Sequence, residues 1–172
     1  MTSVMEMVAH CGAWLELNQP PRVIVCERQG WWTVALRGYL SADVPLVETR
    51  TVASAWRLLA ETPAAFVVAE LCRANADALL DRLARQERDF PLVRVAVVAD
   101  RSLAAWEWLV REAGAVHFTT SPREAAVLAD MARRHLDQLP RPKKSLEEAI
   151  WDMLPWRRSA SGQADREMAG PR

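Results

Sequence analysis

The side chains that could do metal or redox chemistry are few. The 172-residue chain has three cysteines, Cys11, Cys26 and Cys72, and none of them belongs to a CxxC or CxxH pair. Disulfide frameworks and zinc modules are therefore excluded. Cys26 and Cys72 follow strands expected to be neighbours, and we expect both thiols to be reduced. His10 lies beside Cys11, but adjacent residues rarely converge on one ion, so we predict no metal and no cofactor.

Patterns for nucleophilic or nucleotide chemistry are missing as well. Ser102 and Ser121 lack the GxSxG context of a catalytic serine. No GxGxxG or GxxxxGK[ST] loop occurs. The only lysines are the adjacent Lys143 and Lys144, so every strongly basic residue of the preceding chain is an arginine. A mechanism that needs a lysine before that pair is excluded.

Composition indicates one folded domain with no charge bias. Apolar residues make up 51% of the chain, charged residues make up 26%, and 22 basic residues balance 22 acidic ones. A broad electrostatic surface for nucleic acid or anionic lipid is therefore not expected. No apolar run approaches the roughly 18 residues of a membrane span, and no basic leader opens the chain. We predict a cytoplasmic protein without nucleic-acid or membrane partners.

Short apolar runs alternate with longer segments of helical period. Residues such as Ala76, Leu79, Leu80 and Leu83 recur at i, i+3, i+4 and i+7, which indicates amphipathic helices. Valine-rich runs with little polar alternation suit strands that are buried on both faces. The expected strands are 23–26, 45–48, 65–69, 93–99 and 115–119. This order predicts a doubly wound α/β fold with five strands and five helices.

The flanking segments differ from this unit in composition. We expect an N-terminal extension over 1–21, the main domain over 22–139, a Pro-rich basic linker over 140–144 and a disordered tail over 157–172. Between linker and tail, residues 145–156 form a short segment that is apolar at i, i+3, i+4 and i+7, behind a Ser145/Glu148 capping box. We predict a docking helix here, because so short a helix is not stable alone. Its apolar contacts are expected from Leu146, Ile150, Trp151, Met153, Leu154 and Trp156.

The order of these elements, and the run from Gly114 and Ala115 through Phe118 to Pro122, resemble the receiver domain of bacterial response regulators. The resemblance covers about 22–138. It implies a flavodoxin-like five-stranded parallel sheet of order 2-1-3-4-5 with helices on both faces.

A receiver's phosphorylation chemistry needs acids at the strand ends for a divalent cation, an Asp acceptor, a hydroxyl and a lysine. By resemblance, the two acidic positions are Cys26 and Glu27, and the acceptor position is Glu70. The hydroxyl position is Val98 and the lysine position is Ser121. Because these positions are changed together, the resemblance implies a pseudo-receiver without a working phosphorylation site.

We therefore predict a non-enzymatic signalling adaptor that acts by protein contact. One alternative is a residual phosphoacceptor or metal-dependent regulator that uses Glu27 and Glu70, and Glu70 could also mimic a phosphorylated Asp by its charge. A further alternative is a small enzyme on a flavodoxin-like scaffold, with a site at the strand ends.

The predicted partner contacts outside 145–156 are aromatic. Trp106 fits an apolar stripe, whereas Trp108, two residues later, points away from it and is a candidate interaction anchor. By resemblance, Trp108 and Phe118 belong to the face made by the fourth helix, fifth strand and fifth helix, where receivers meet partners or form homodimers. The partner is an unidentified protein, with a homodimer through this face as one alternative.

Overall fold

The computed structural model describes residues 20–139. The predicted docking segment, the linker and tail, and residues 1–19 of the predicted extension lie outside the described residues. In the described part, no helix is long and apolar enough to cross a membrane.

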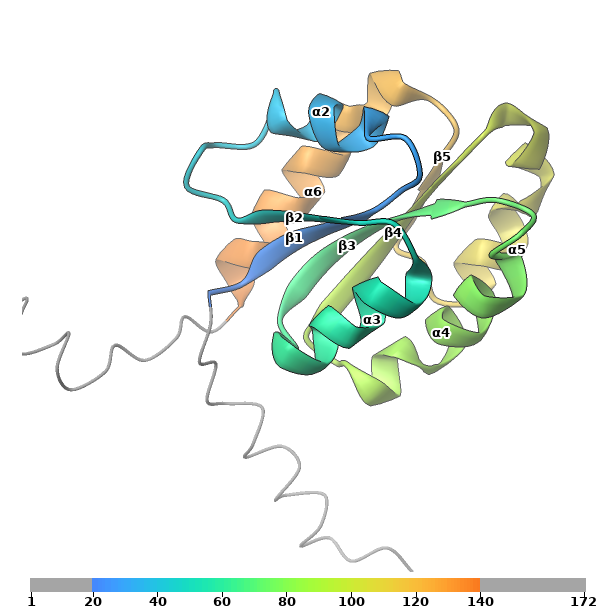
Figure 1. Ribbon diagram of the computed structural model, residues 1–172, viewed down its shortest axis with the longest axis horizontal. Coiled ribbons are helices and arrows are strands. Elements are labelled where there is room, and N and C mark those ends of the chain that lie inside the picture. The colour runs from blue at the N-terminus through green and yellow to red at the C-terminus, as the bar shows by residue number, and fades with distance from the viewer. Residues whose placement is uncertain (1–19, 140–172) are drawn as a thin grey trace, which may run out of the picture. The chain divides into compact units, whose positions relative to one another are not determined.

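A five-stranded parallel sheet of order β2-β1-β3-β4-β5 forms the centre of the domain, as predicted (Figure 1). The strands are β1 (Arg22–Cys26), β2 (Leu46–Thr49), β3 (Ala65–Leu71), β4 (Val93–Ala99) and β5 (His117–Thr119). The helices are α2 (Trp31–Arg37), α3 (Val52–Glu61), α4 (Ala76–Asp89), α5 (Glu107–Glu112) and α6 (Ala125–Gln138). A 3₁₀ helix over Arg101–Trp106 precedes α5, and a second over Pro122–Glu124 precedes α6.

Two helical layers cover the two faces of the sheet. One layer holds α2 and α6, and the other holds α3, α4 and α5 (Figure 1). In β3 alternate side chains enter opposite cores, with Val67 in one and Phe66 and Val68 in the other. Because β3 is buried on both faces, its sequence is an almost continuous apolar run.

The helical stripes place their apolar side chains in these cores, as the periodicity predicts. Leu79 and Leu83 of α4 are buried, as is Leu128 of α6. The apolar stripe to which Trp106 belongs is divided between the 3₁₀ helix, which holds Leu103 and Trp106, and α5, which holds Val110.

The predicted fifth strand is shorter than expected. Pairing with β4 begins at His117, so Ala115 and Val116 precede the strand instead of belonging to it. Gly114 turns the chain into this approach at a φ of +113°, in the region that favours glycine. A Cβ at this position would also lie 3.2 Å from the carbonyl oxygen of Leu83.

His135 of α6 joins this helix to the amino ends of two strands. Its Nε2 lies 3.2 Å from the carbonyl oxygen of Ala65 and 3.1 Å from that of Leu92. Burial lowers the pKa of His135 below its usual value, and the positive charge of Arg94 acts in the same direction, although the two carbonyls oppose the shift. The folded protein therefore favours neutral His135.

This pKa shift predicts acid destabilisation through His135. Below the ordinary histidine pKa of about 6.5 the unfolded chain takes up a proton that the folded chain resists, so the free energy of unfolding should fall as pH falls. Between about pH 8 and pH 5, the fall should be larger for the natural protein than for His135→Gln, measured by urea denaturation. An identical pH dependence in the two proteins would contradict this role of His135.

Candidate functional site at the carboxyl edge of the sheet

The carboxyl ends of the parallel strands meet at one edge of the sheet, and this edge is hollowed. Glu27 follows β1 directly, and Glu70 is aligned with Val98 in the pairing of β3 with β4. Glu27 and Glu70 both line an open hollow of about 310 Å³, together with Trp31 and Thr120. The structure thus brings these two carboxylates to one hollow.

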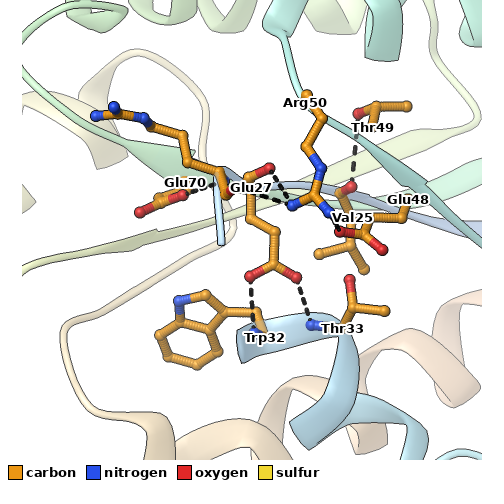
Figure 2. A network of polar contacts seen from close by, with 9 residues as sticks. Val25, Glu27, Trp32, Thr33, Glu48, Thr49, Arg50 and Glu70 are labelled. Atoms are coloured by element: carbon orange, nitrogen blue, oxygen red, sulfur yellow. Dashed lines mark hydrogen bonds and ion pairs between the residues drawn. The ribbon is translucent and has the colours of Figure 1, made fainter. Parts of the chain in front are cut away.

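Glu27 is buried and has a structural role in the fold. Its side chain is 2% exposed. One carboxylate oxygen accepts the backbone N–H of Trp32 at 2.8 Å, and the other accepts that of Thr33 at 2.6 Å (Figure 2). These N–H groups belong to the first turn of α2, which has no intrahelical partners for them. Glu27 therefore caps α2, and its negative charge lies at the positive end of the helix dipole.

The loop between β1 and α2 makes this cap possible. Gly30 precedes α2 with a φ of +85°, and it makes no side-chain cap of its own. The carboxylate of Glu27, three residues upstream, supplies the oxygens that a short Asp or Ser usually supplies at the N-cap.

Arg50 fixes the same loop from the neighbouring strand. Its Nη1 donates to the carbonyl oxygen of Arg28 at 2.9 Å and lies 3.4 Å from that of Glu27. Its Nη2 pairs with Glu48 Oε1 at 2.6 Å (Figure 2). The guanidinium thus ties the end of β2 to the turn that positions Glu27.

Glu70 is held less tightly and is partly exposed. Its Oε2 accepts the backbone N–H of Arg28 at 2.7 Å. Its backbone carbonyl accepts Asn75 Nδ2 at 2.7 Å, and Asn75 Oδ1 in turn accepts the N–H of Cys72 at 2.8 Å. Asn75 therefore shapes the turn after β3, and Glu70 itself bridges to the loop that contains Glu27.

Cys26 occupies the other acidic position of the resemblance but lies in the core. The side chain is 3% exposed and packs with the cluster on the α3 side of the sheet. Burial raises the pKa of the thiol, partly offset by a hydrogen bond with Thr49. A buried, protonated thiol is a poor metal ligand and a poor nucleophile. Cys26 and Cys72 are both free.

Val98, at the hydroxyl position of the resemblance, has no hydroxyl, and Ser121, at the lysine position, has no amine. Val98 is fully buried in the core on the α2 and α6 side. Ser121 is partly exposed, and its backbone N–H donates to Thr119 Oγ1 at 3.0 Å. Among the residues around Ser121, Thr120 and Pro122 line the hollow.

The residues present do not fit the divalent cation that the resemblance implies. The oxygens of Glu27 are bonded to N–H groups, and Cys26 is buried. Within residues 20–139, no group of three or more His, Cys, Asp or Glu side chains could hold a metal ion.

Sequence reasoning missed two charged residues of the hollow, Asp100 and Arg101. The Asp100 side chain accepts the backbone N–H of Ser102 at 2.8 Å, and this bond, first among its causes, lowers the pKa of the carboxyl. Arg101 is an exposed cation that lines the same hollow as Thr120 and Pro122. The signal that could have found both is their position immediately after the buried run 93–99.

Two predicted contact residues differ in exposure. Trp108 is 71% exposed on α5, whereas Trp106 packs partly buried against the core. Phe118 is only 6% exposed and belongs to that core, so the expectation that it contacts a partner is corrected: its ring is used to pack β5. His117 Nε2 lies 3.2 Å from Glu124 Oε2.

Comparison of this architecture with solved structures gives consistent results. A response regulator from Thermotoga maritima superposes with a TM-score of 0.55 and 19% sequence identity, over 70% of this chain and all of that one. The chain has the receiver fold. An orphan response regulator of H. pylori matches with a TM-score of 0.52 and 18% identity, over 67% of this chain and 95% of the other. A CheY-like protein, TadZ, from Pseudomonas aeruginosa gives 0.51 and 20%, over 71% and 97%.

No protein-family model matches the sequence, and no curated protein matches it. The receiver fold is therefore established through structure, at identities too low to transfer the chemistry of any relative.

The cap predicts that Glu27 stabilises this receiver fold. Glu27→Ala leaves two N–H groups of α2 without their acceptors, so the free energy of unfolding should fall by about 1–3 kcal/mol, measured by chemical denaturation. Glu70→Ala is the matched control, because it removes a carboxylate from the same edge that accepts one N–H at a partly exposed site. Its cost should be under about 1 kcal/mol. Equal losses in the two variants would show that the cap is not the cause.

Proposed function

We propose that this receiver-fold protein is a cytoplasmic pseudo-receiver, a non-enzymatic signalling adaptor that acts by protein contact and independently of phosphorylation. The observation that supports it best is the state of Glu27. Both oxygens of this carboxylate bind the first turn of α2, so the group that would hold a cation in a receiver is part of the scaffold here.

The other positions agree with this proposal. Phosphoryl transfer is catalysed mainly by positioning and by positive charge near the transferred group. Val98 is buried and has no hydroxyl, and Ser121 has no charge. Glu70 has the longer arm of a glutamate and accepts a backbone N–H, so it is poorly placed as a phosphoacceptor. Within residues 20–139, no cluster of His, Cys, Asp or Glu side chains favours the alternative of a metal-dependent regulator.

Protein contact is supported by exposed apolar side chains near the last strand. Trp108 and Leu109 of α5, Val116 before β5 and Val127 of α6 are all at least 36% exposed. Exposed aromatic side chains are frequent anchors of protein interfaces. The docking helix over 145–156 remains a second proposed contact, on sequence grounds alone.

The first experiment tests phosphorylation independence. Magnesium with beryllofluoride or acetyl phosphate should leave the melting temperature of the full chain unchanged, because a ligand without a site adds no stability. Labelled phosphoryl donor should also leave Glu70→Asp unmodified, since the acceptor length is restored without the hydroxyl or the lysine. A phosphorylatable receiver treated in parallel is the positive control. A saturable rise of several degrees would overturn the proposal.

The second experiment tests the contact role of Trp108. Trp108→Asp should change the free energy of unfolding by less than about 0.5 kcal/mol, because the side chain is exposed. It should reduce capture of the partner from an extract of the organism that makes the protein. Trp106→Ala is the matched control, expected to lower stability by about 1–3 kcal/mol through lost packing.

Two further measurements test the other proposed contacts. Sedimentation of the natural chain and Trp108→Asp shows whether the partner is a second copy. Capture by Ile150→Asp combined with Trp156→Asp shows whether residues 145–156 contribute. Undiminished capture by Trp108→Asp would remove this residue from the contact.

A further inference from the structure

The outer side of β2 is a strand edge. β2 is terminal in the sheet, and within residues 20–139 its one strand neighbour is β1. The N–H of Val23 donates to the carbonyl oxygen of Pro45 at 2.8 Å, and the N–H of Glu27 donates to that of Thr49 at 3.1 Å. The carbonyls just before β2 and at its last residue therefore point toward β1.

Alternation along β2 directs the backbone groups between these two carbonyls outward. The register aligns Leu46 with Val23 and Glu48 with Val25. Successive residues of a strand present their N–H and C=O groups to opposite sides, so Leu46 and Glu48 face away from β1. The turn, loop and cap hydrogen bonds within residues 20–139 do not include these groups. Two backbone donors and two acceptors are thus open to a further strand.

An open hollow of about 440 Å³ lies beside the start of β2. It is lined by Arg37 at the end of α2, by Leu46, and by the connection between α2 and β2, which includes Leu40 and Val44. Leu40, Val44 and Leu46 pack only partly buried against the core on the α2 and α6 side. A side chain placed beside Leu46 on this face of the sheet would therefore meet an apolar surface.

Arg37 adds a positive charge to the margin of this hollow. It is exposed, and the ion pairs found within residues 20–139 involve other arginines. Asp43, in the same connection, does not line the hollow. A hydrogen bond with Ser41 is the first cause that lowers the pKa of the Asp43 carboxyl. The guanidinium of Arg37 is therefore available to a carboxylate from outside.

The edge is too short and too polar for general sheet growth. β2 has four residues, and Pro45 precedes it. Glu48 Oε1 pairs with Arg50 Nη2 at 2.6 Å. Short strands, proline and charged side chains are features that limit association of one sheet edge with another. A segment that binds here therefore has to match the hollow as well as the backbone.

We propose that an extended segment of a partner protein adds to the outer side of β2, with an apolar side chain in the hollow and a carboxylate beside Arg37. In strand addition, main-chain hydrogen bonds supply affinity and alternate side chains supply specificity. Leu46 and Glu48 offer the main-chain groups, and the hollow offers the side-chain site. The inference rests on the proposed adaptor role and deepens it, because it names the conformation and chemistry of the partner segment.

The binding test uses the full chain and a set of labelled peptides of about seven residues. Each has valine, leucine or phenylalanine at the centre, glutamate two positions to either side and threonine elsewhere, so that glutamate and the central residue share a face when extended. Fluorescence anisotropy should show saturable binding of at least one peptide.

Backbone methylation of the same peptide is the matched control. N-methyl groups on alternate residues remove donors without changing side chains, and they can be placed on the even or on the odd residues. One of the two methylated peptides should bind at least about tenfold more weakly, because its donors face β2. The other should bind nearly normally, because its methyl groups face away.

Variants of the chain locate the contact. Glu48→Pro removes an N–H that does not face β1, and it should weaken peptide binding at least about fivefold. Glu48→Ala removes the same carboxylate but keeps the N–H, so it should bind nearly normally. Arg37→Glu should weaken binding at least about threefold, whereas Arg57→Glu, on the exposed side of α3, should not. Melting temperatures verify that each variant is folded.

Amide hydrogen exchange gives a second measurement that needs no variant. In the free chain, the amides of Leu46 and Glu48 should exchange faster than those of Val47 and Thr49, which face β1. Saturating peptide should slow the exchange of Leu46 and Glu48 and leave that of Val47 and Thr49 nearly unchanged.

Other results overturn the proposal. Failure of every peptide to bind, or equal binding by both methylated peptides, would exclude strand addition. Slow exchange of Leu46 and Glu48 in the free chain would assign the edge to another segment of this chain. A natural dimer that dissociates in Glu48→Pro but not in Glu48→Ala would assign it to a second copy. A beryllofluoride response would refute phosphorylation independence and leave these results untouched.

Discussion

Burial of the parallel sheet on both faces is the constraint on which the rest of the molecule depends. Side chains along β3 and β4 enter one core or the other, so almost every position within them must be apolar. Within the sheet, polar and charged groups can therefore gather only where the strands end. Both hollows discussed above lie at such ends, one at the carboxyl ends of the strands and one at the amino end of β2.

At the carboxyl edge the charged side chains hold the scaffold together. Glu27 holds the first turn of α2, and Arg50 holds the loop that presents Glu27. Glu70 links to the same loop through the N–H of Arg28. These contacts give the edge a structural task that is independent of any ligand, and they support the proposed loss of phosphoryl chemistry.

The sequence was sufficient for the fold because the fold depends on periodic burial. The run Val93–Ala99 predicted β4 at its observed bounds, and the stripe with Leu79 and Leu83 predicted the buried side of α4. The fifth strand was predicted too long, since Ala115 is as apolar as a strand residue but lies in the approach after Gly114. Composition does not distinguish a buried approach from a buried strand.

The candidate site could be predicted only in part, for reasons of geometry. The resemblance assigned Glu27 and Glu70 to strand ends, and in the structure both line one hollow at the carboxyl edge of the sheet. The capping role of Glu27 depends on the turn at Gly30, and the contact between His117 and Glu124 depends on a 3₁₀ turn. Neither turn produces a periodic pattern in the sequence. The resemblance assigned Phe118 to a partner-binding face. In the structure this aromatic residue is buried in the core.

The Gln86 side chain has a consequence for the behaviour of the protein at high concentration. Pairing with β5 begins at Ala96, so the start of β4 has a strand neighbour only on the β3 side. Unpaired strand backbone of this kind can pair with another molecule. The buried amide of Gln86 occupies the carbonyl of Val93 at this point. One glutamine on α4 thereby occupies a backbone acceptor at the start of β4, where the sheet has a strand on one side only.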